Sequence, residues 1–364
     1  MNKMNKITKP KNSFFPFKEV GATLFLSKEN IRYFSSLNHS LEFEGLLFLR
    51  KNQNPQYIVS PLEGLSSPHK VVTKKPKEYL KQFSGLTLGI DENSISVKNF
   101  KFFKKFFKLK DISNQISNMR EIKSDAELKL IKKACLLSEK VLSEIKSILL
   151  TQSKKSKKNI IIHFKSENDI KVYIKKRAID LDCELSFEPI VASGKNAAKP
   201  HYSKSTRLSK GFLVIDMGLK YRGYCADITR TFFIGTPSIE EKNIYNLVLK
   251  SQKEAISLIK PNIKISSLEN ISRKVLGNYS NLFIHSLGHG LGIDVHELPY
   301  VSKKSSKNLK KGMVITIEPG VYQSDSQNAS NSFGIRIEDD VLVTSSGYKL
   351  LSNFPKKLFS FPKI

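Results

Sequence analysis

The chain has 364 residues, of which 40% are hydrophobic, and a formal net charge of +28. This length predicts two domains with an ample core, and the ordinary hydrophobic content excludes fibrous and intrinsically disordered classes. No apolar stretch reaches the roughly 18 residues that a membrane-spanning helix needs, so we expect no membrane association.

The excess positive charge would suit a nucleic-acid partner, but the kind of basic residue argues against one. Only 9 of the 61 basic residues are Arg, and the other 52 are Lys. Surfaces that bind nucleic acids favour Arg, because its planar fork grips phosphates and guanine edges. We therefore interpret the lysines as a solvated surface that reflects drift in an AT-rich genome, and expect no nucleic-acid partner.

Residues from about 20 to 110 alternate short apolar runs with turn signals, as in an α/β domain. Apolar runs bounded by turn residues predict strands at 21–27, 44–50, 55–61 and 86–91. Helical spacing of apolar residues predicts helices at 28–37 and 75–83. Interleaved Phe and Lys at 99–111 predict an amphipathic helix packed on its own domain, with attachment to a membrane surface as the alternative.

A long helix is predicted to follow Ser124, because Ser124 and Glu127 form a capping-box pattern and apolar residues then recur at helical spacing. We place the domain boundary just before it, which gives domains at 1–120 and 121–364. Beyond the long helix we predict a Lys- and Ser-rich loop at 151–159, a helix at 166–181, a strand within 185–194, and helices near 238–260 and 266–277.

The three cysteines, Cys135, Cys183 and Cys225, lie far apart and show no CxxC spacing. They therefore support neither a disulfide framework nor a thiolate zinc site. This usage is typical of a reducing compartment, so we expect a cytoplasmic protein.

An ordered set of oxygen and nitrogen donors lies in apolar segments of the C-terminal half. Its members are Asp216 in FLVIDMG, Asp227 in DITRTFFIG, His289 in HSLGHGLGIDVHE, Glu318 in VITIEPG and Glu338 in FGIRIEDDVLV. A buried carboxylate costs several kcal/mol unless it is paired, hydrogen-bonded or bound to a metal. Four carboxylates and a histidine together predict a cation site.

Each donor taken alone also has a simpler interpretation. Asp216 and Asp227 flank a Gly-containing turn between apolar strands, which predicts a hairpin that brings the two carboxylates together. Alternatively, Asp216 caps a turn and Asp227 pairs with Arg230. Glycines around His289 disfavour a helix and indicate closely packed backbone, although a lone histidine is often a satisfied core or loop residue.

Arg336 and Glu338 share one face of a predicted strand. Arg336 can therefore orient a carboxylate or a substrate through a bidentate hydrogen bond, and the alternative for it is a surface salt bridge.

A donor set rich in carboxylates with one imidazole suits a pair of Mn²⁺, Co²⁺, Fe²⁺ or Zn²⁺ ions rather than soft metals. Two such ions lower the pKa of a water molecule between them and polarise a carbonyl group. A nearby carboxylate can then carry the proton to a leaving amine. The predicted reaction is metal-assisted hydrolysis of an acyl bond, most economically a peptide bond.

The segments that carry the donors resemble the pita-bread metallopeptidase family, which includes methionine aminopeptidase, aminopeptidase P and prolidase. The resemblance runs from EIKSDAEL to DDVLVT, and the motifs IDMG, ADITRTFFIG, HxxGHGLGxxVHE, TIEPGVY and GIRIEDD occur in that order. It implies an α/β (α+β) fold: a pita-bread catalytic domain, in which helices flank a pseudo-twofold antiparallel sheet, and a smaller N-terminal α/β domain. Relatives form dimers and tetramers, so a homodimer or homotetramer is implied.

The resemblance also implies a role for each donor. Asp216 would bind one metal, Asp227 and Glu338 would bridge two, and His289 and Glu318 would hold the other. Mn²⁺ is the first candidate, with Co²⁺, Zn²⁺ or Fe²⁺ as alternatives. Glu318 would in addition carry the proton during catalysis.

Further positions match residues that act on the peptide substrate. His201 matches a histidine that contacts substrate near the scissile carbonyl, and His296 matches one that supports the tetrahedral intermediate. His285, Tyr322 and Arg336 match substrate-binding or supporting positions.

The N-terminal domain and the segment REIKSDAEL resemble aminopeptidase P and prolidase rather than methionine aminopeptidase. Some prolidases carry an Arg shortly after the HE dipeptide to grip the free carboxylate of a dipeptide, and HELPY puts Tyr300 there. This departure favours a Xaa-Pro aminopeptidase, which removes the N-terminal residue when proline follows. A prolidase that cleaves Xaa-Pro dipeptides is the alternative, and an inactive relative that serves as a binding module is more distant, because all five donors are present.

Overall fold

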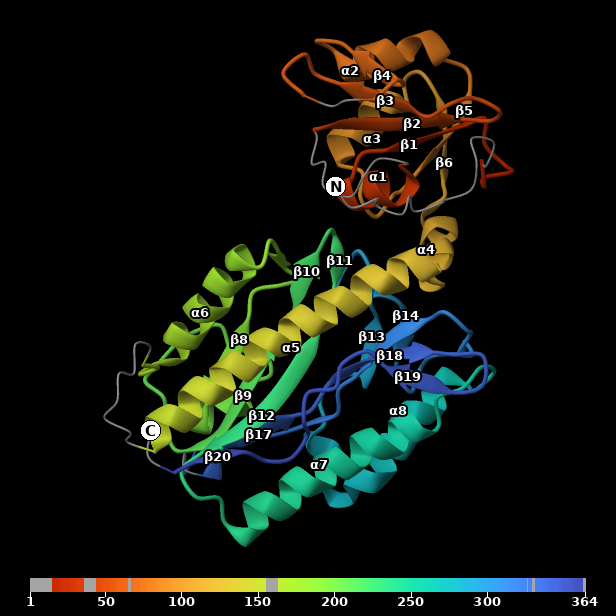
Figure 1. The fold of residues 1–364 in the computed structure, drawn as a ribbon. Coiled ribbons are helices and arrows are strands. Elements are labelled where there is room, and N and C mark those ends of the chain that lie inside the picture. The colour runs from red at the N-terminus through yellow and green to blue at the C-terminus, as the bar shows by residue number, and fades with distance from the viewer. Residues whose placement is uncertain are drawn as a thin grey trace. The chain divides into compact units, whose positions relative to one another are not determined.

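The computed structural model of the protein describes residues 15–35, 44–64, 67–154, 163–325, 327–328 and 331–362. The chain divides into two compact units, Met1–Met119 and Arg120–Ile364. Figure 1 labels most of their helices and strands. Most of the loop predicted at 151–159 lies outside the described residues.

The N-terminal unit contains a six-stranded mixed sheet in the order β4-β3-β2-β1-β5-β6. Its strands are β1 (Ala22–Phe25), β2 (Gly45–Arg50), β3 (Gln56–Val59), β4 (Lys70–Val72), β5 (Thr87–Ile90) and β6 (Lys108–Asp111). Its helices are α1 (Lys28–Phe34), α2 (Pro76–Tyr79), the 3-10 helix η1 (Leu80–Phe83), α3 (Val97–Phe103) and α4 (Ser113–Glu121), which runs across the boundary. Alternate residues of β1, β2 and β3 pack into two apolar clusters, so the sheet has a core on each face.

The C-terminal unit contains one arrangement twice, a pair of helices followed by antiparallel strands (Figure 1). The first half consists of α5 (Asp125–Ser153), α6 (Glu167–Asp180), β7 (Glu184–Leu185), β8 (Ile190–Ser193), η2 (Gly194–Ala198), β9 (Gly211–Met217), β10 (Leu219–Tyr221), β11 (Tyr224–Cys225) and β12 (Ile228–Ile234). The second half consists of α7 (Ile239–Ser257), α8 (Ile265–Leu276), η3 (Gly277–Leu282), β13 (Gly288–Gly290), β14 (Glu297–Val301), β15 (Val314–Ile317), β16 (Gly320–Gln323), β17 (Phe333–Arg336), β18 (Asp339–Val343) and β19 (Tyr348–Leu350). The last strand, β20 (Ser360–Phe361), returns to pair with β12.

Each half packs its helices mainly against its own strands, although Phe212 of β9 and Phe233 of β12 also join the cluster of the second half. Helices α5 and α6 share one apolar cluster with β9 and β12, and α7 and α8 share another with β15 and β18. Since an amphipathic helix must bury its apolar face, this pairing follows from the helical spacing in the sequence. The predicted α/β (α+β) fold with helices backing antiparallel strands is confirmed.

The two halves meet where β12 lies against the residues around the end of β17. The backbone N–H of Glu338 donates to the carbonyl oxygen of Thr229 at 3.1 Å. The hydroxyl of Thr231 donates to the carbonyl oxygen of Arg336 at 2.8 Å. Side chains from both halves are therefore fixed next to one another at this junction.

The capping box predicted at Ser124 is present. The backbone N–H of Ser124 donates to Glu127 Oε2 at 2.9 Å, and the backbone N–H of Glu127 donates to Ser124 Oγ at 3.4 Å. The same box begins α6 at Ser166 and α7 at Ser238. These caps fix where the helices start, because they satisfy N–H groups that lack partners within the helix.

Two predicted elements are wrong in detail. The helix predicted at 99–111 ends at Phe103, and 108–111 form β6, because Leu109 pairs with Leu88 at the edge of the sheet. The turn predicted between Asp216 and Asp227 is itself a hairpin of β10 and β11, and Asp216 lies opposite Thr229 instead of Asp227. Pairing with β5, which the local sequence does not encode, decides the first case, and a short local hairpin decides the second.

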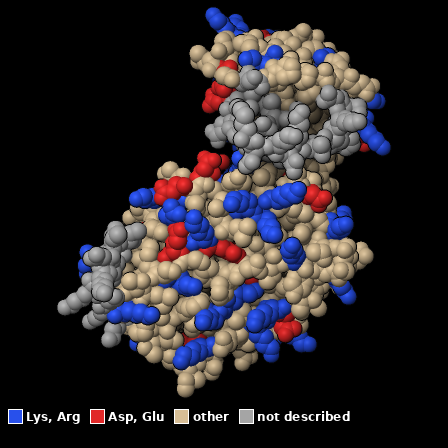
Figure 2. All heavy atoms as spheres, viewed as in Figure 1, with Lys and Arg blue, Asp and Glu red and all other residues tan. Residues whose placement is uncertain are grey.

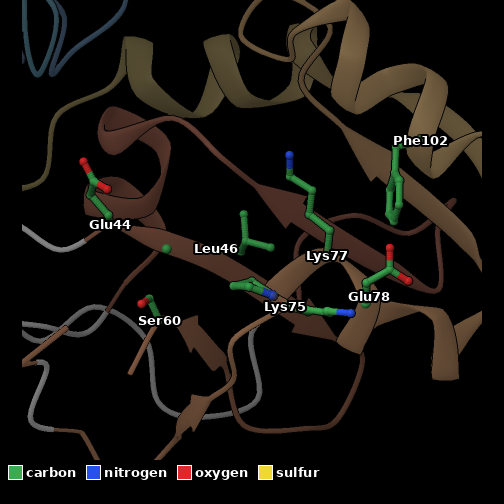
Figure 3. A pocket seen from close by; sticks show the side chains of 9 residues that line it. Glu44, Leu46, Ser60, Lys75, Lys77, Glu78 and Phe102 are labelled. Atoms are coloured by element: carbon green, nitrogen blue, oxygen red, sulfur yellow. The ribbon is translucent and has the colours of Figure 1, made fainter. Parts of the chain in front are cut away.

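The N-terminal unit carries a hollow of about 570 Å³, shown in Figure 3. Its lining comes from the ends of β2 and β3 and from α2 and α3: Glu44, Gly45, Leu46, Ser60, Lys75, Pro76, Lys77, Glu78 and Phe102. The four charged side chains are balanced in sign, and the lining offers no histidine or cysteine. This hollow therefore lacks the donor set that the sequence predicts for a metal centre.

On the face shown in Figure 2, Lys and Arg side chains are scattered among uncharged and acidic residues rather than gathered in one patch. This distribution is consistent with solvated lysines, and the absence of a nucleic-acid partner stays a prediction. Among the described residues, every helix is too short or too polar to cross a membrane.

Candidate metal centre

The five predicted donors converge at the junction between the two halves of the C-terminal unit. Asp216 lies on β9, Asp227 precedes β12, His289 lies on β13, Glu318 follows β15, and Glu338 lies between β17 and β18. Donor atoms of Asp227, His289 and Glu338 all lie within 4.8 Å of one another. The imidazole Nε2 of His289 lies 3.3 Å from Glu318 Oε1 and 3.7 Å from Asp227 Oδ2.

The glycines around His289 allow the backbone to pack closely, as the sequence predicts. A Cβ atom on Gly288 would lie 2.1 Å from the carbonyl oxygen of Thr316, and one on Gly290 would lie 2.3 Å from that of Leu298. Strand β13 therefore fits between β14 and β15 only because these residues lack side chains. The same packing fixes the backbone of His289, whose N–H donates to Thr316 Oγ1 at 3.1 Å.

The orientation of the His289 ring suits a metal ligand. Its Nδ1 lies 3.1 Å from the carbonyl oxygen of Gly290, a distance at which an N–H on Nδ1 donates to that oxygen. In the neutral ring this bond leaves the Nε2 lone pair directed at the carboxylates. Against the effect of burial, the hydrogen bond with Glu318 raises the pKa of His289.

Three of the predicted donors each present a buried oxygen that has no hydrogen-bond partner among the described residues, namely Asp216 Oδ1, Asp227 Oδ1 and Glu338 Oε1, and Oδ1 of the neighbouring Asp340 is a fourth such oxygen. The other oxygen of Asp216 accepts from Arg336 Nη2 at 2.6 Å, and that of Glu338 accepts from Thr229 Oγ1 at 2.6 Å. In each of these two carboxylates, the protein thus binds one oxygen and leaves the other oxygen without a partner. A buried oxygen without a partner is costly, and a divalent cation is the partner that this set fits.

The charges of the site lead to the same conclusion. Burial, followed by the charge of Glu338, raises the pKa of Asp227 well above its usual range. Burial, followed by the charge of Glu318, does the same to Glu338. Against burial, the hydrogen bond and charge of His289 lower the pKa of Glu318 to about 2. Carboxylates that repel one another in an apolar site are stabilised in their ionised form by bound cations.

A hydrogen-bonded chain supports the centre from one side. Arg336, which is 4% exposed, donates from Nη2 to Asp216 and from Nη1 to Tyr322 Oη, in each case at 2.6 Å. Tyr322 Oη lies 3.1 Å from His285 Nε2. The alternative of a surface salt bridge for Arg336 is therefore wrong.

Arg230 does not pair with Asp227, so that alternative is also wrong. Its guanidinium donates instead to Asp339 Oδ1 at 2.7 Å and to the carbonyl oxygens of Thr229, Glu338 and Phe354. Arg230 is three residues beyond Asp227, and side chains alternate between the two faces of a strand, so the two side chains point to opposite faces. On the neighbouring strand β9, Arg230 lies opposite Ile215.

Of the predicted substrate residues, Tyr322 and Arg336 are buried, and the two histidines that follow are exposed. The ring of His296 packs edge-on against His289 with centroids 4.3 Å apart, and His296 itself is exposed. His201 is exposed as well, and it follows η2, whose backbone at Ala197 touches Gly334 of β17. Tyr300 is 59% exposed.

Sequence reasoning missed the side chains that orient the donors. Thr229 binds Glu338, Thr316 binds both His289 and Glu318, and Asp340 accepts the backbone N–H of Asp227 at 3.0 Å. One signal was available: polar residues inside apolar strands, as in ITRTF and EDDVLV, need a partner once they are buried. Which partner each one has depends on the pairing between the halves.

The comparisons with known proteins agree with this geometry. The model of metallopeptidase family M24 matches residues 129–345. The chain is 37% identical over 294 residues to a Xaa-Pro dipeptidase of Pyrococcus horikoshii, an alignment that covers 78% of either chain.

The solved structures that resemble this chain include both kinds of Xaa-Pro peptidase. One is prolidase from Pyrococcus furiosus, with a TM-score of 0.77 and 30% identity over 92% of this chain and 96% of that chain. Another is X-Pro aminopeptidase from Thermotoga maritima MSB8, with a TM-score of 0.78 and 26% identity over 94% of this chain and 97% of that chain. The predicted pita-bread fold is confirmed by these similarities. The backbone fold alone does not separate the two activities, because the TM-scores are nearly equal.

Proposed function

The chain belongs to metallopeptidase family M24, and we propose from this premise that it is a Xaa-Pro dipeptidase, which cleaves dipeptides whose second residue is proline. The observation that carries this choice is the 37% identity to a Xaa-Pro dipeptidase over more than three quarters of the chain. The aminopeptidase activity that Tyr300 favours in the sequence becomes the second candidate. The exposed Tyr300 is a weak reason to exclude a dipeptide substrate, because a cationic side chain at another position can bind the free carboxylate of the dipeptide.

The donor residues are proposed to hold two divalent ions, with Mn²⁺ as the first candidate. When bound, such ions activate water and polarise the scissile carbonyl. Asp216, Asp227 and Glu338 would each direct the free carboxylate oxygen described above at the ions. His289 would bind through Nε2, and Glu318 would complete the set.

Glu318 is also proposed to move the proton. Its side chain is 16% exposed, compared with 11% for Asp216 and 8% for Asp227, so it is more open to a substrate than either. A carboxylate at this position can take the proton of the attacking water and pass it to the leaving proline nitrogen. Thr316 would orient it, since its hydroxyl lies 3.2 Å from Glu318 Oε1.

Two histidines are proposed to act on the peptide itself. Partial burial of the ring against His289, followed by the charge of His289, lowers the pKa of His296 and favours the neutral ring, which can donate one hydrogen bond to the developing oxyanion. His201 would contact the substrate near the scissile bond from the neighbouring segment. His285, Tyr322 and Arg336 would fix Asp216 and the wall of the site.

The deciding experiment compares three peptides with the purified, metal-loaded protein: a Xaa-Pro dipeptide, a Xaa-Pro-Xaa tripeptide and a Xaa-Ala dipeptide. A dipeptidase cleaves the first with the highest kcat/KM and leaves the third nearly untouched. Preference for the tripeptide would replace the proposal with the aminopeptidase candidate.

Two equivalents of metal per chain are expected, and loading with Mn²⁺, Co²⁺, Zn²⁺ and Fe²⁺ in turn ranks the metals. The homodimer or homotetramer and the cytoplasmic location stay predictions.

A further inference from the structure

A single buried carboxylate binds both ends of the segment that carries His201, here called the His201 segment (residues 194–206). Glu167, the first residue of α6, is 0% exposed. Its Oε1 accepts from the backbone N–H of Ser193 at 2.7 Å, and its Oε2 accepts from the backbone N–H of Thr206, also at 2.7 Å. The two oxygens of one side chain therefore close a loop of the chain at its base.

Further contacts with α6 hold the interior of the segment. The side-chain amide of Asn196 donates to Glu167 Oε1 at 3.0 Å and to Thr206 Oγ1 at 2.8 Å. Lys171, one turn further along α6 and 6% exposed, donates to the carbonyl oxygen of Lys204 at 3.2 Å. One face of α6 thus holds the His201 segment near its start and near its end. Buried hydrogen bonds to charged groups are stronger than those between neutral groups.

The opposite side of the segment rests on the strand that leads to Arg336. A Cβ atom on Gly334 would lie 1.8 Å from the carbonyl oxygen of Ala197, so η2 touches the backbone of β17 directly. Ala197 and Tyr202 are buried in one apolar cluster with Val214. Tyr202 is 6% exposed, whereas its neighbour His201 is exposed. The body of the segment is fixed between α6 and β17, and the imidazole is left outside.

We propose that Glu167 and Lys171 are positioning residues, which hold the His201 segment so that His201 meets the substrate beside the metal centre. The inference rests on the proposed function, in which His201 contacts the peptide. Neither residue touches substrate or metal in this assignment. A displacement of about 1 Å at a group that contacts substrate can lower the rate about 100-fold, so the rigidity of this segment has a direct kinetic consequence.

The first test measures the segment without using activity. In Glu167→Gln, the side-chain amide offers an oxygen to one backbone N–H and an NH₂ group to the other, so one end of the segment loses its acceptor. We expect faster hydrogen–deuterium exchange in peptides that span 194–206, with unchanged metal content. Glu144→Gln is the matched control, because Glu144 binds Tyr173 and Arg177 of the same helix away from the segment. Equal exchange in Glu167→Gln and wild type would overturn the proposal.

The second test asks whether the effect passes through His201. We expect Glu167→Gln to lower kcat/KM for a Xaa-Pro dipeptide by about 10- to 100-fold. In a His201→Ala background the same substitution should have almost no further effect, since the contact that it misplaces is already absent. If the two losses in kcat/KM multiply in the double variant, Glu167 acts on the whole fold and not through His201. That result would overturn the proposal.

A milder substitution keeps the tests decisive if Glu167→Gln does not fold. Lys171→Met removes one hydrogen bond at the far end of the segment and keeps the apolar stem, so exchange and kcat/KM should change in the same direction by a smaller factor. No change in either would overturn the role of Lys171. A wild-type protein that holds metal but cleaves none of the three peptides would refute the proposed function alone. The exchange measurements test whether Glu167 and Lys171 hold the His201 segment, and they do not depend on activity.

Discussion

Replacing Arg230 by Met should destabilise the C-terminal unit by more than any surface substitution. The guanidinium is 2% exposed and lies 2.7 Å from Asp339 Oδ1, while Nη1 and Nη2 also bind the carbonyl oxygens of Glu338 and Phe354. Removing one partner of a buried ion pair costs about 3–5 kcal/mol, because the remaining charge stays buried without compensation. Asp339 keeps Lys356 at 2.6 Å, so we expect the lower end of that range.

The assay is guanidinium-induced unfolding of the metal-free protein, followed by circular dichroism, with separate transitions fitted where two occur. Lys242→Met is the control for loss of a positive charge, since Lys242 is exposed on α7, and it should shift the free energy of unfolding by less than about 0.5 kcal/mol. Arg230 also fixes the backbone of Glu338, so metal affinity should fall about 10- to 100-fold. An unfolding midpoint equal to that of Lys242→Met would refute the reasoning.

Three further results are expected. Glu318→Ala and Asp227→Ala should each abolish peptide hydrolysis while circular dichroism stays that of the wild type, and full activity in either would remove the assigned roles. Against burial, the charges of Lys123 and Arg120 lower the pKa of Glu297. Its contribution to stability is therefore present above the unfolded pKa of about 4.3 and is lost as the pH falls through the folded value. Glu297→Gln should accordingly lower the free energy of unfolding at pH 7 by more than at pH 3, and a constant difference would contradict this sign. Gly288→Ala should lower stability and metal content together, because its Cβ would lie 2.1 Å from the Thr316 carbonyl oxygen; native metal content by elemental analysis would argue against the close packing.

The sequence predicts the kinds of donor and their convergence better than it predicts their neighbours. The five donors stand out because charged residues interrupt apolar strands, a local pattern that needs no knowledge of the fold. The glycines beside His289 were predicted to allow close backbone packing, and they do so by admitting β13 between two strands. Local patterns carried both inferences.

What the sequence does not predict depends on contacts between the two halves. Arg230 and Arg336 look alike as single cations in apolar strands, yet one binds Asp339 and the other Asp216. The connection between Asp216 and Asp227 forms its own hairpin, which the turn residues alone do not separate from a simple loop. Glu167 gave no signal at all, because a glutamate at a helix N-terminus is also a common solvent-exposed residue.

The residues that join the two halves are the same residues that orient the donors. Thr229 accepts the backbone N–H of Glu338 through its carbonyl oxygen and donates to the carboxylate of Glu338 through its hydroxyl. The same hydroxyl accepts from Arg336 Nε at 3.1 Å, and Arg336 in turn holds Asp216. Backbone pairing between the halves and ligand geometry are thus fixed by one set of hydrogen bonds.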